Sequence, residues 1–153
     1  MSDDARIPRP ALLLGLAGLI PFLWSAATHL SPALAASAGQ WLKPMFLGSY
    51  VGLTWGTVVL AFLSGVLWGF ATKAEGREAA IAYTLSVIPA LWGFVMVSDA
   101  SDTSAIFLAA GFAGLLLLDA TFQAWGLAPR WWLRLKVMLT VVTLACLAIP
   151  LQA

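Results

Sequence analysis

Long runs of apolar residues alternate with short polar stretches along the whole chain. Five runs are long enough to cross a bilayer as a helix, which takes roughly 20 mostly apolar residues. They cover positions 10–28, 45–71, 79–97, 104–123 and 131–151. The pattern predicts an all-α fold: a single domain, 1–153, built as an integral membrane bundle of five transmembrane helices.

The composition supports a bilayer environment for these runs. Hydrophobic residues make up 61% of the chain and charged residues 10%, whereas soluble domains have about 45–50% and about 25%. Water could not solvate such a surface, so the class of soluble globular proteins is excluded. The lipid bilayer is the expected partner, and no nucleic-acid partner is expected.

Basic residues fall almost entirely on one side of the predicted membrane. With five spans, the N-terminus shares a side with the second and fourth connections, and Lys43 is left on the other side. The shared side carries seven of the eight Lys and Arg residues: Arg6, Arg9, Lys73, Arg77, Arg130, Arg134 and Lys136. Because cytoplasmic loops are enriched in Lys and Arg, we expect a cytoplasmic N-terminus and a periplasmic C-terminus.

The first span is expected to remain in the mature protein. Positions 33–35 resemble a cleavage site, but they lie well past the apolar run, and Asp3 and Asp4 make the start acidic. Signal peptides begin with a basic region, and mitochondrial transit peptides are Arg-rich and poor in acidic residues. The sequence therefore favours a multi-pass protein of the bacterial inner membrane.

Prolines mark helix entrances and kinks. Pro10, Pro44 and Pro129 stand at the start of spans, where the missing N–H has no partner to lose. Pro21 and Pro89 lie inside spans. Each should kink its helix and free a carbonyl that a neighbouring helix or side chain must satisfy.

The second span carries the clearest packing pattern, because small residues recur every four positions in two series. These are Gly48, Gly52 and Gly56, and then Ala61, Gly65 and Gly69. At about 100° per residue the two series face opposite ways, and small residues let helices approach closely in lipid. We expect this span to be the central helix, packed on different neighbours in its two halves. A homodimer face or a narrow ligand cleft is the alternative.

Asp119 is the one carboxylate inside a predicted span. At the centre of a span it would cost about 2.5–3.5 kcal/mol, which the apolar residues of 104–123 can offset. The partners considered for it are Lys73, Arg77, Arg130 and Arg134. An ion pair that locks the bundle is favoured over a proton or cation relay, because a relay normally needs several ionisable groups in series.

The eight tryptophans divide into interfacial and deeper positions. Trp24 and Trp41 suit the outer interface, and the inner aromatic belt would contain Trp125, Trp131 and Trp132. The deeper indole N–H groups, which need hydrogen-bond partners, belong to Trp55, Trp68 and Trp92.

A small polar pocket is expected among the deeper positions. Its predicted lining is Ser64, Trp68, Tyr83, Ser86 and Asp119. Ordinary hydrogen bonds between helices are the alternative explanation for these polar residues.

The remaining polar positions suggest little chemistry. Arg130, Arg134 and Lys136 should attract anionic lipid head groups. His29 has no second histidine with which to bind a metal, so no metal and no cofactor are expected, and Ser101 or Asp102 should cap the fourth span. The lone cysteine, Cys146, is expected to be a core residue.

Several segments in a fixed order resemble the transmembrane protein 69 family, small membrane proteins classed as a domain of unknown function. They are Pro10 with LLGLAGLIPF at 13–22, FLSGVLWG at 62–69, Tyr83 with SVIP at 86–89, Asp119, and WLRLK at 132–136. The chain has Ser64 where the family often has a second glycine, and Leu67 where it often has a polar residue. The resemblance implies a bacterial inner-membrane location and no named activity. The tryptophan-rich translocator proteins are a second resemblance, but their Pro- and Trp-rich segments are not reproduced.

Two functions remain open at this point. The short loops, the glycine series and the lack of paired catalytic groups favour a non-catalytic accessory or assembly subunit of a larger membrane complex, with other membrane proteins as partners. The alternative is a binder or carrier of a hydrophobic or small ligand in an intramembrane pocket. An enzyme is not expected, because no nucleophile–base pair stands out.

Overall fold

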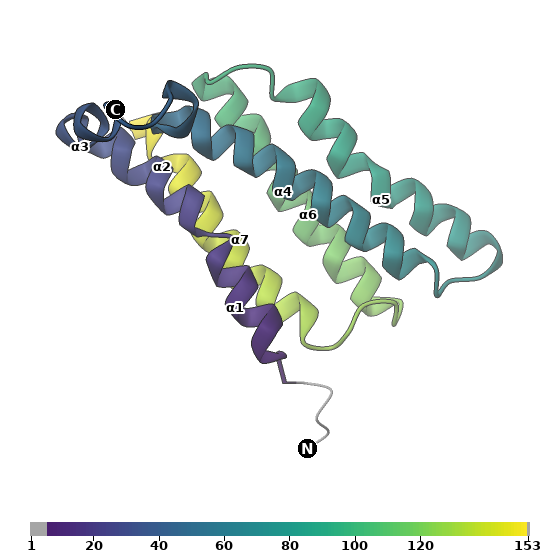
Figure 1. Ribbon diagram of the computed structural model, residues 1–153. Helices are drawn as coiled ribbons and strands as arrows, with labels where there is room; N and C mark the ends of the chain where they lie inside the picture. The colour runs from purple at the N-terminus through teal and green to yellow at the C-terminus, as the bar shows by residue number, and fades with distance from the viewer. Residues whose placement is uncertain (1–5, 153) are drawn as a thin grey trace.

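The computed structural model describes residues 6–152, and its long helices run side by side in a bundle (Figure 1). The described residues contain no β-strand, which confirms the predicted all-α fold. The helices are α1 (Arg9–Ala17), α2 (Ile20–Leu30), α3 (Pro32–Ala38), α4 (Gly48–Ala71), α5 (Gly76–Met96), α6 (Asp102–Ala124) and α7 (Trp132–Ala148), with 3-10 turns η2 (Pro44–Phe46) and η3 (Pro150–Gln152).

Within residues 6–152, four stretches are long and apolar enough to cross a membrane: Arg9–Leu30, Gly48–Ala71, Gly76–Met96 and Asp102–Ala124. They begin and end within three residues of the first four predicted spans. The fifth predicted span corresponds to α7, which has 17 residues and extends about 26 Å at 1.5 Å per residue. That α7 crosses the membrane stays a prediction.

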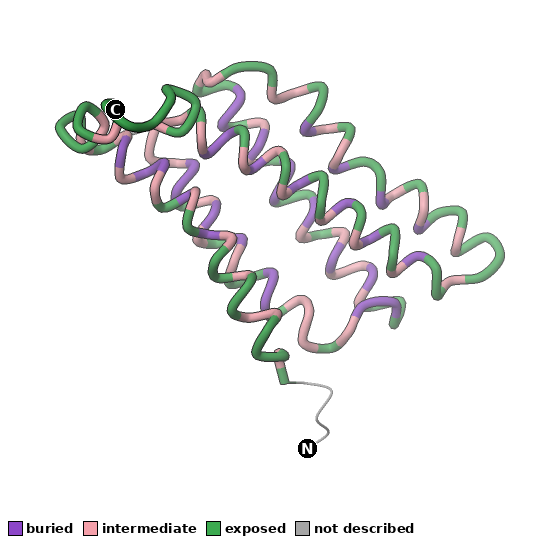
Figure 2. The backbone as a smooth tube through the Cα atoms, in the orientation of Figure 1, coloured by how far each residue is buried: buried purple, intermediate pink, exposed green. Residues whose placement is uncertain are grey.

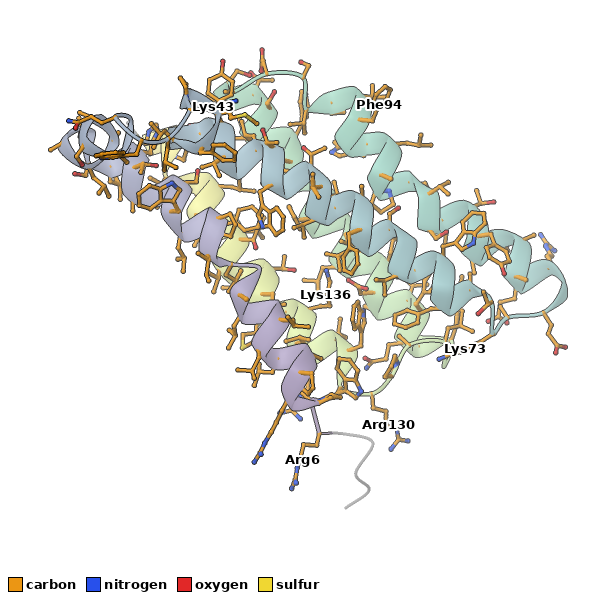
Figure 3. All side chains as sticks on the ribbon, in the orientation of Figure 1. Arg6, Lys43, Lys73, Phe94, Arg130 and Lys136 are labelled. Atoms are coloured by element: carbon orange, nitrogen blue, oxygen red, sulfur yellow. The ribbon has the colours of Figure 1, made fainter. Side chains whose placement is uncertain are left out.

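The connections alternate between the two ends of the bundle. The start of α1, the α4–α5 turn and the α6–α7 connection lie at one end, and α3 and the end of α7 lie at the other (Figure 1). Figure 3 shows Arg6, Lys73 and Arg130 at the first end and Lys43 at the opposite end. The fold therefore gathers Arg6, Lys73 and Arg130 at the same end of the bundle.

Helix α4 is central, because it packs against α2, α5 and α6. Leu60 and Leu67 on α4 have no exposed surface, and buried residues follow the inward faces of the helices in Figure 2. Large apolar side chains also cover the outside: Phe62 is 67% exposed, and Phe94, which points outward in Figure 3, is 80% exposed. An apolar exterior of this extent suits contact with lipid.

The first apolar run is interrupted near Pro21, as its sequence predicted. Helix α1 ends at Ala17 and α2 begins at Ile20. At the interruption the indole N–H of Trp55 on α4 donates to the carbonyl of Gly18 at 2.8 Å. A neighbouring helix thus satisfies a backbone group at the break and ties α1 and α2 to α4.

Candidate functional site

A buried polar cluster joins the end of α6 to the start of α7. Asp119 is 1% exposed and Lys136 is 3% exposed. The indole N–H of Trp132 donates to Oδ1 of Asp119 at 2.6 Å, and Nζ of Lys136 lies 3.5 Å from Oδ2. Two residues one helical turn apart on α7 therefore hold the two oxygens of one carboxylate.

The ion pair is long for its degree of burial. Charge-assisted N–H···O bonds are typically about 2.7–2.9 Å, and Oδ2 of Asp119 has no hydrogen bond within the described chain. Removing two charges from water is costly, and close, well-directed contacts normally offset that cost. This pair compensates charge but leaves hydrogen-bonding capacity unused on both partners.

The short α6–α7 connection positions the cluster. Gly126 adopts φ +74°, a left-handed conformation that glycine accepts without strain. The carbonyl of Leu127 accepts a hydrogen bond from Nζ of Lys73 at 3.0 Å, and the ring of Phe70 meets Trp132 edge-on at 5.3 Å. The end of α4 thus braces the connection and the indole that binds Asp119.

An apolar cavity of about 490 Å³ lies beside this cluster. Residues from α1, α2, α4, α6 and α7 line it, among them Trp55, Phe112, Trp132 and Lys136. Its volume falls within the range of small-molecule sites, about 300–1,000 Å³. The cavity therefore combines a lipid-like wall with one buried ammonium group.

The predicted partner of Asp119 was wrong. The sequence argument considered Lys73, Arg77, Arg130 and Arg134, whereas the structure pairs Asp119 with Lys136. Lys136 is one turn into α7, so its side chain reaches inward rather than toward the head groups, as Figure 3 shows.

The other residues predicted for the inner surface divide between the surface and the interior. Arg130 and Arg134 are exposed, as a head-group role requires. Trp132 belongs to the interior cluster rather than to an aromatic belt. Trp125, which was also predicted for the aromatic belt, is 39% exposed.

Four residues of the predicted pocket form a packed α4–α5 seam instead: Ser64, Trp68, Tyr83 and Ser86. None of them lines the apolar cavity. Ser64 donates to the carbonyl of Ser86 and accepts from the backbone N–H of Ala90 at 3.3 Å. In a regular helix that N–H bonds that carbonyl, and Pro89 lies between the two residues in the sequence. Ser64 therefore bridges the pair at the proline, and the structure separates this seam from Asp119, which faces α7.

Trp68 and Tyr83 complete the seam at its outer edge. Their rings lie 4.8 Å apart, and Trp68 is half-exposed. A partly exposed aromatic pair of this kind adds packing at the surface of the bundle. It brings no polar group toward the apolar cavity.

Two glycines of the first series on α4, Gly52 and Gly56, lie in close contact with other helices. A Cβ on Gly52 would lie 2.5 Å from Oγ of Ser25, and one on Gly56 would lie 2.5 Å from Cδ2 of Leu108. Gly48 begins the helix with φ +55° and has open space around it. A Cβ at Gly52 or Gly56 would force Ser25 or Leu108 to shift, so close approach of the helices explains these two glycines.

The glycines of the second series, Gly65 and Gly69, do not pack against another described helix. A Cβ on Gly65 or Gly69 would meet no atom within 4 Å. This half of α4 packs against α5 through Ser64 and Trp68, but the expected contact through its glycines is missing from the described part of the chain. The two series do face opposite ways: Gly52 and Gly56 are buried, and Gly65 and Gly69 are exposed.

A small polar cluster lies at the α5–α6 connection. Oδ1 of Asp99 accepts bonds from the hydroxyl groups of Ser101 and Ser104 and from the backbone N–H of Ser101. These bonds, led by that from the Ser101 hydroxyl, hold the pKa of Asp99 below its usual range. Ser101 also caps α6 by accepting from the Ser104 N–H at 3.2 Å, as predicted. Nδ1 of His29 lies 3.4 Å from the Ser49 hydroxyl.

A second cavity of about 340 Å³ lies next to Asp99 and is lined by residues of α4 and the α5–α6 connection. No group of three or more potential metal ligands occurs among residues 6–152.

Comparison with known proteins places the chain in a family. A model for a family described as "Protein of unknown function (DUF3429)" matches residues 7–152. The chain belongs to this family. It is 32% identical to Transmembrane protein 69 of Xenopus tropicalis over 139 residues, which are 88% of the chain and 51% of that protein. It is 27% identical to Transmembrane protein 69 of Mus musculus over 148 residues, which are 94% of the chain and 56% of that protein.

The chain spans about half the length of the curated relatives it matches. No solved structure matches it. The family match and these relatives confirm the resemblance inferred from the sequence. Together with the apolar helices, they identify a multi-pass integral membrane protein in contact with the bilayer.

Sequence reasoning considered Arg134 on α7 but did not foresee the pairing of Asp119 with Lys136 on the same helix. The available signal was the four-residue spacing of Trp132 and Lys136, which puts an indole N–H and an ammonium on one helical face. Proximity to the positively charged end directed attention to the cations nearer that end of the bundle instead. The cavity itself depends on how α1, α4 and α7 diverge, which no local pattern encodes.

Proposed function

We propose that this DUF3429 protein is a non-catalytic membrane protein that binds a hydrophobic ligand in the cavity between α1, α4 and α7. The observation that carries the proposal is the 490 Å³ apolar cavity with Lys136 in its wall. Ligand sites are mostly apolar, with a few placed polar groups that fix orientation. This arrangement favours ligand binding over a purely packed bundle.

The proposal includes five membrane crossings, a cytoplasmic N-terminus and the bacterial inner membrane. Seven of the eight basic residues lie in the N-terminal segment, the α4–α5 turn and the region from the α6–α7 connection into the start of α7, which supports that orientation. An α7 of 17 residues lies at the lower limit for a spanning helix, about 17–25 residues.

An accessory-subunit role is the second candidate. The outward-facing glycines Gly65 and Gly69 favour it, because small residues let a partner helix approach closely. Mild-detergent purification from the native membrane, followed by mass spectrometry, tests this role. A stoichiometric partner that is lost in the Gly65→Leu/Gly69→Leu variant would support it, and an unchanged partner set would exclude this face.

The ligand-binding proposal is tested with the purified protein in nanodiscs and a bromine-labelled alkane, which quenches tryptophan fluorescence on contact. Val59 lines the cavity, so Val59→Phe should reduce quenching by filling it. The matched control is Val95→Phe, on a residue that is 67% exposed on α5. Equal quenching in the wild type and both variants would overturn the proposal.

A further inference from the structure

Lys136 is the charged residue in the lining of the cavity, which also includes the hydroxyl groups of Thr140 and Thr143. Trp55 and Trp132 both border the cavity, but their N–H groups are used by the Gly18 carbonyl and by Asp119. The two indoles therefore offer apolar rings and no spare donor. A ligand in this cavity would meet mostly hydrocarbon and aromatic surface, with an ammonium group on one wall.

Lys136 retains donor capacity toward the cavity. An ammonium group carries three N–H donors, and within residues 6–152 its nearest acidic partner is Oδ2 of Asp119 at 3.5 Å. The side chain is almost completely buried, so bulk water does not supply the missing acceptors. Leaving a buried donor unpaired costs free energy, and a ligand acceptor at this wall would remove that cost.

The charges of Asp119 and Lys136 determine which kind of ligand group would bind beside Nζ. Asp119 balances Lys136, so an anionic ligand beside Nζ would also approach a carboxylate in a low-dielectric setting, where like charges repel strongly. A cationic ligand would meet the ammonium group itself. An uncharged oxygen gains a charge-assisted hydrogen bond without either repulsion.

We propose that the ligand is an uncharged, membrane-soluble molecule whose carbonyl oxygen accepts a hydrogen bond from Nζ of Lys136. This inference rests on the proposed ligand-binding function and specifies its chemistry. Two constituents of membranes carry such a group on an apolar body: the ester carbonyl of an acyl lipid and the carbonyl of a lipid-soluble quinone.

The test uses three bromine-labelled probes of equal chain length: tridecanone, tridecanoic acid and tridecane. Binding is measured by tryptophan quenching in nanodiscs of ether-linked lipids, which lack ester carbonyls. The wild type should bind the ketone about tenfold more tightly than the alkane, the scale expected for one hydrogen bond to a charged group. It should also bind the ketone more tightly than the acid.

Two variants separate the contributions of the pair. Asp119→Asn leaves the ammonium uncompensated, so the acid should overtake the ketone. Asp119→Asn/Lys136→Met removes both charges and keeps the site neutral, so the preference for the ketone should vanish while alkane binding persists. Lys43→Met, at the opposite end of the bundle, is the matched lysine control and should leave the wild-type order unchanged.

The outcomes test this inference separately from the proposed ligand-binding function on which it rests. Equal binding of ketone and alkane by the wild type, tighter binding of the acid, or a ketone preference that survives in the double variant would overturn the inference. Quenching that is insensitive to Val59→Phe for all three probes would overturn the ligand-binding function itself. Competition by ester lipids or by an added quinone then identifies the source of the carbonyl.

Discussion

The α4–α5 seam and the α6–α7 cluster both bury polar groups inside an apolar bundle, but they do so differently. At the seam, Ser64 both donates and accepts, so it satisfies the backbone pair that flanks Pro89. At the cluster, Nζ of Lys136 and Oδ2 of Asp119 form an ion pair at 3.5 Å, and this Oδ2 has no hydrogen bond within residues 6–152. The seam is neutral and saturated, whereas the cluster is charged and unsaturated.

This difference indicates what each polar group does. A saturated neutral contact completes the backbone of a helix that contains a proline and has nothing left with which to bind a ligand. An unsaturated charged pair on the wall of a cavity has spare donors. Polar residue type alone, which is what the sequence displays, does not separate the two cases.

The largest expected effect comes from breaking the charged pair on one side. Lys136→Met should lower the free energy of unfolding by about 3–5 kcal/mol, because it leaves Asp119 as an uncompensated buried charge. Unfolding by denaturant in detergent micelles measures the change. Asp119→Asn/Lys136→Met should recover most of it, and a double variant as unstable as the single one would contradict the charge explanation.

A smaller effect is expected at the saturated seam. Ser64→Ala should cost about 1–3 kcal/mol, because the Ser86 carbonyl and the Ala90 N–H lose their shared partner while buried. Ser86→Ala is the control, since its hydroxyl bonds only within its own helix, to the carbonyl of Tyr83. Equal unfolding free energies for the two variants would show that Ser64 does not repair the helix.

Trp55 shares features with both regions. Like Ser64, it satisfies a backbone carbonyl, and like Lys136, it borders the cavity. Trp55→Phe keeps an aromatic ring and removes one hydrogen bond, so a loss of about 0.5–1.5 kcal/mol is expected. Hydrogen exchange should rise at amides near the α1–α2 break and stay unchanged in α5. Faster exchange throughout the bundle would argue against a local role.

The smallest effect belongs to Asp99, which is exposed in the α5–α6 connection, where water competes for its hydrogen bonds. Its pKa is lowered in the folded protein, chiefly by the Ser101 hydroxyl. Its contribution to stability is therefore complete above the unfolded pKa, about 3.9, and is lost as the pH falls through the lower folded value. Ser101→Ala should raise the pKa of Asp99 toward its ordinary value in a carbon NMR titration, and Thr84→Ala should not.

Much of the fold follows from local pattern. Apolar run length predicted the helices, and the interruption near Pro21 and the Ser101 cap were predictable because each depends on neighbours in sequence. Gly52 and Gly56 were recognisable as close-contact positions from their spacing.

The site was less predictable, because it depends on which faces of distant helices meet. Lys136 was assigned to the head-group region from its nearness to Arg130 and Arg134, but one helical turn carries its side chain into the interior. Ser64 and Ser86 were grouped with Asp119 by polarity, although they face a different neighbour. Gly65 and Gly69 had the right spacing for packing and no partner within reach.

The Asp119–Lys136 pair also constrains how the chain enters a membrane during synthesis. In the proposed topology, α7 emerges with Lys136 uncompensated, at a cost of up to about 3.5 kcal/mol deep in the hydrocarbon. Asp119 is on the preceding helix, and only a short connection separates α6 from α7. The two helices therefore partition most favourably as one hairpin, so the translocation machinery would have to retain α6 until α7 arrives.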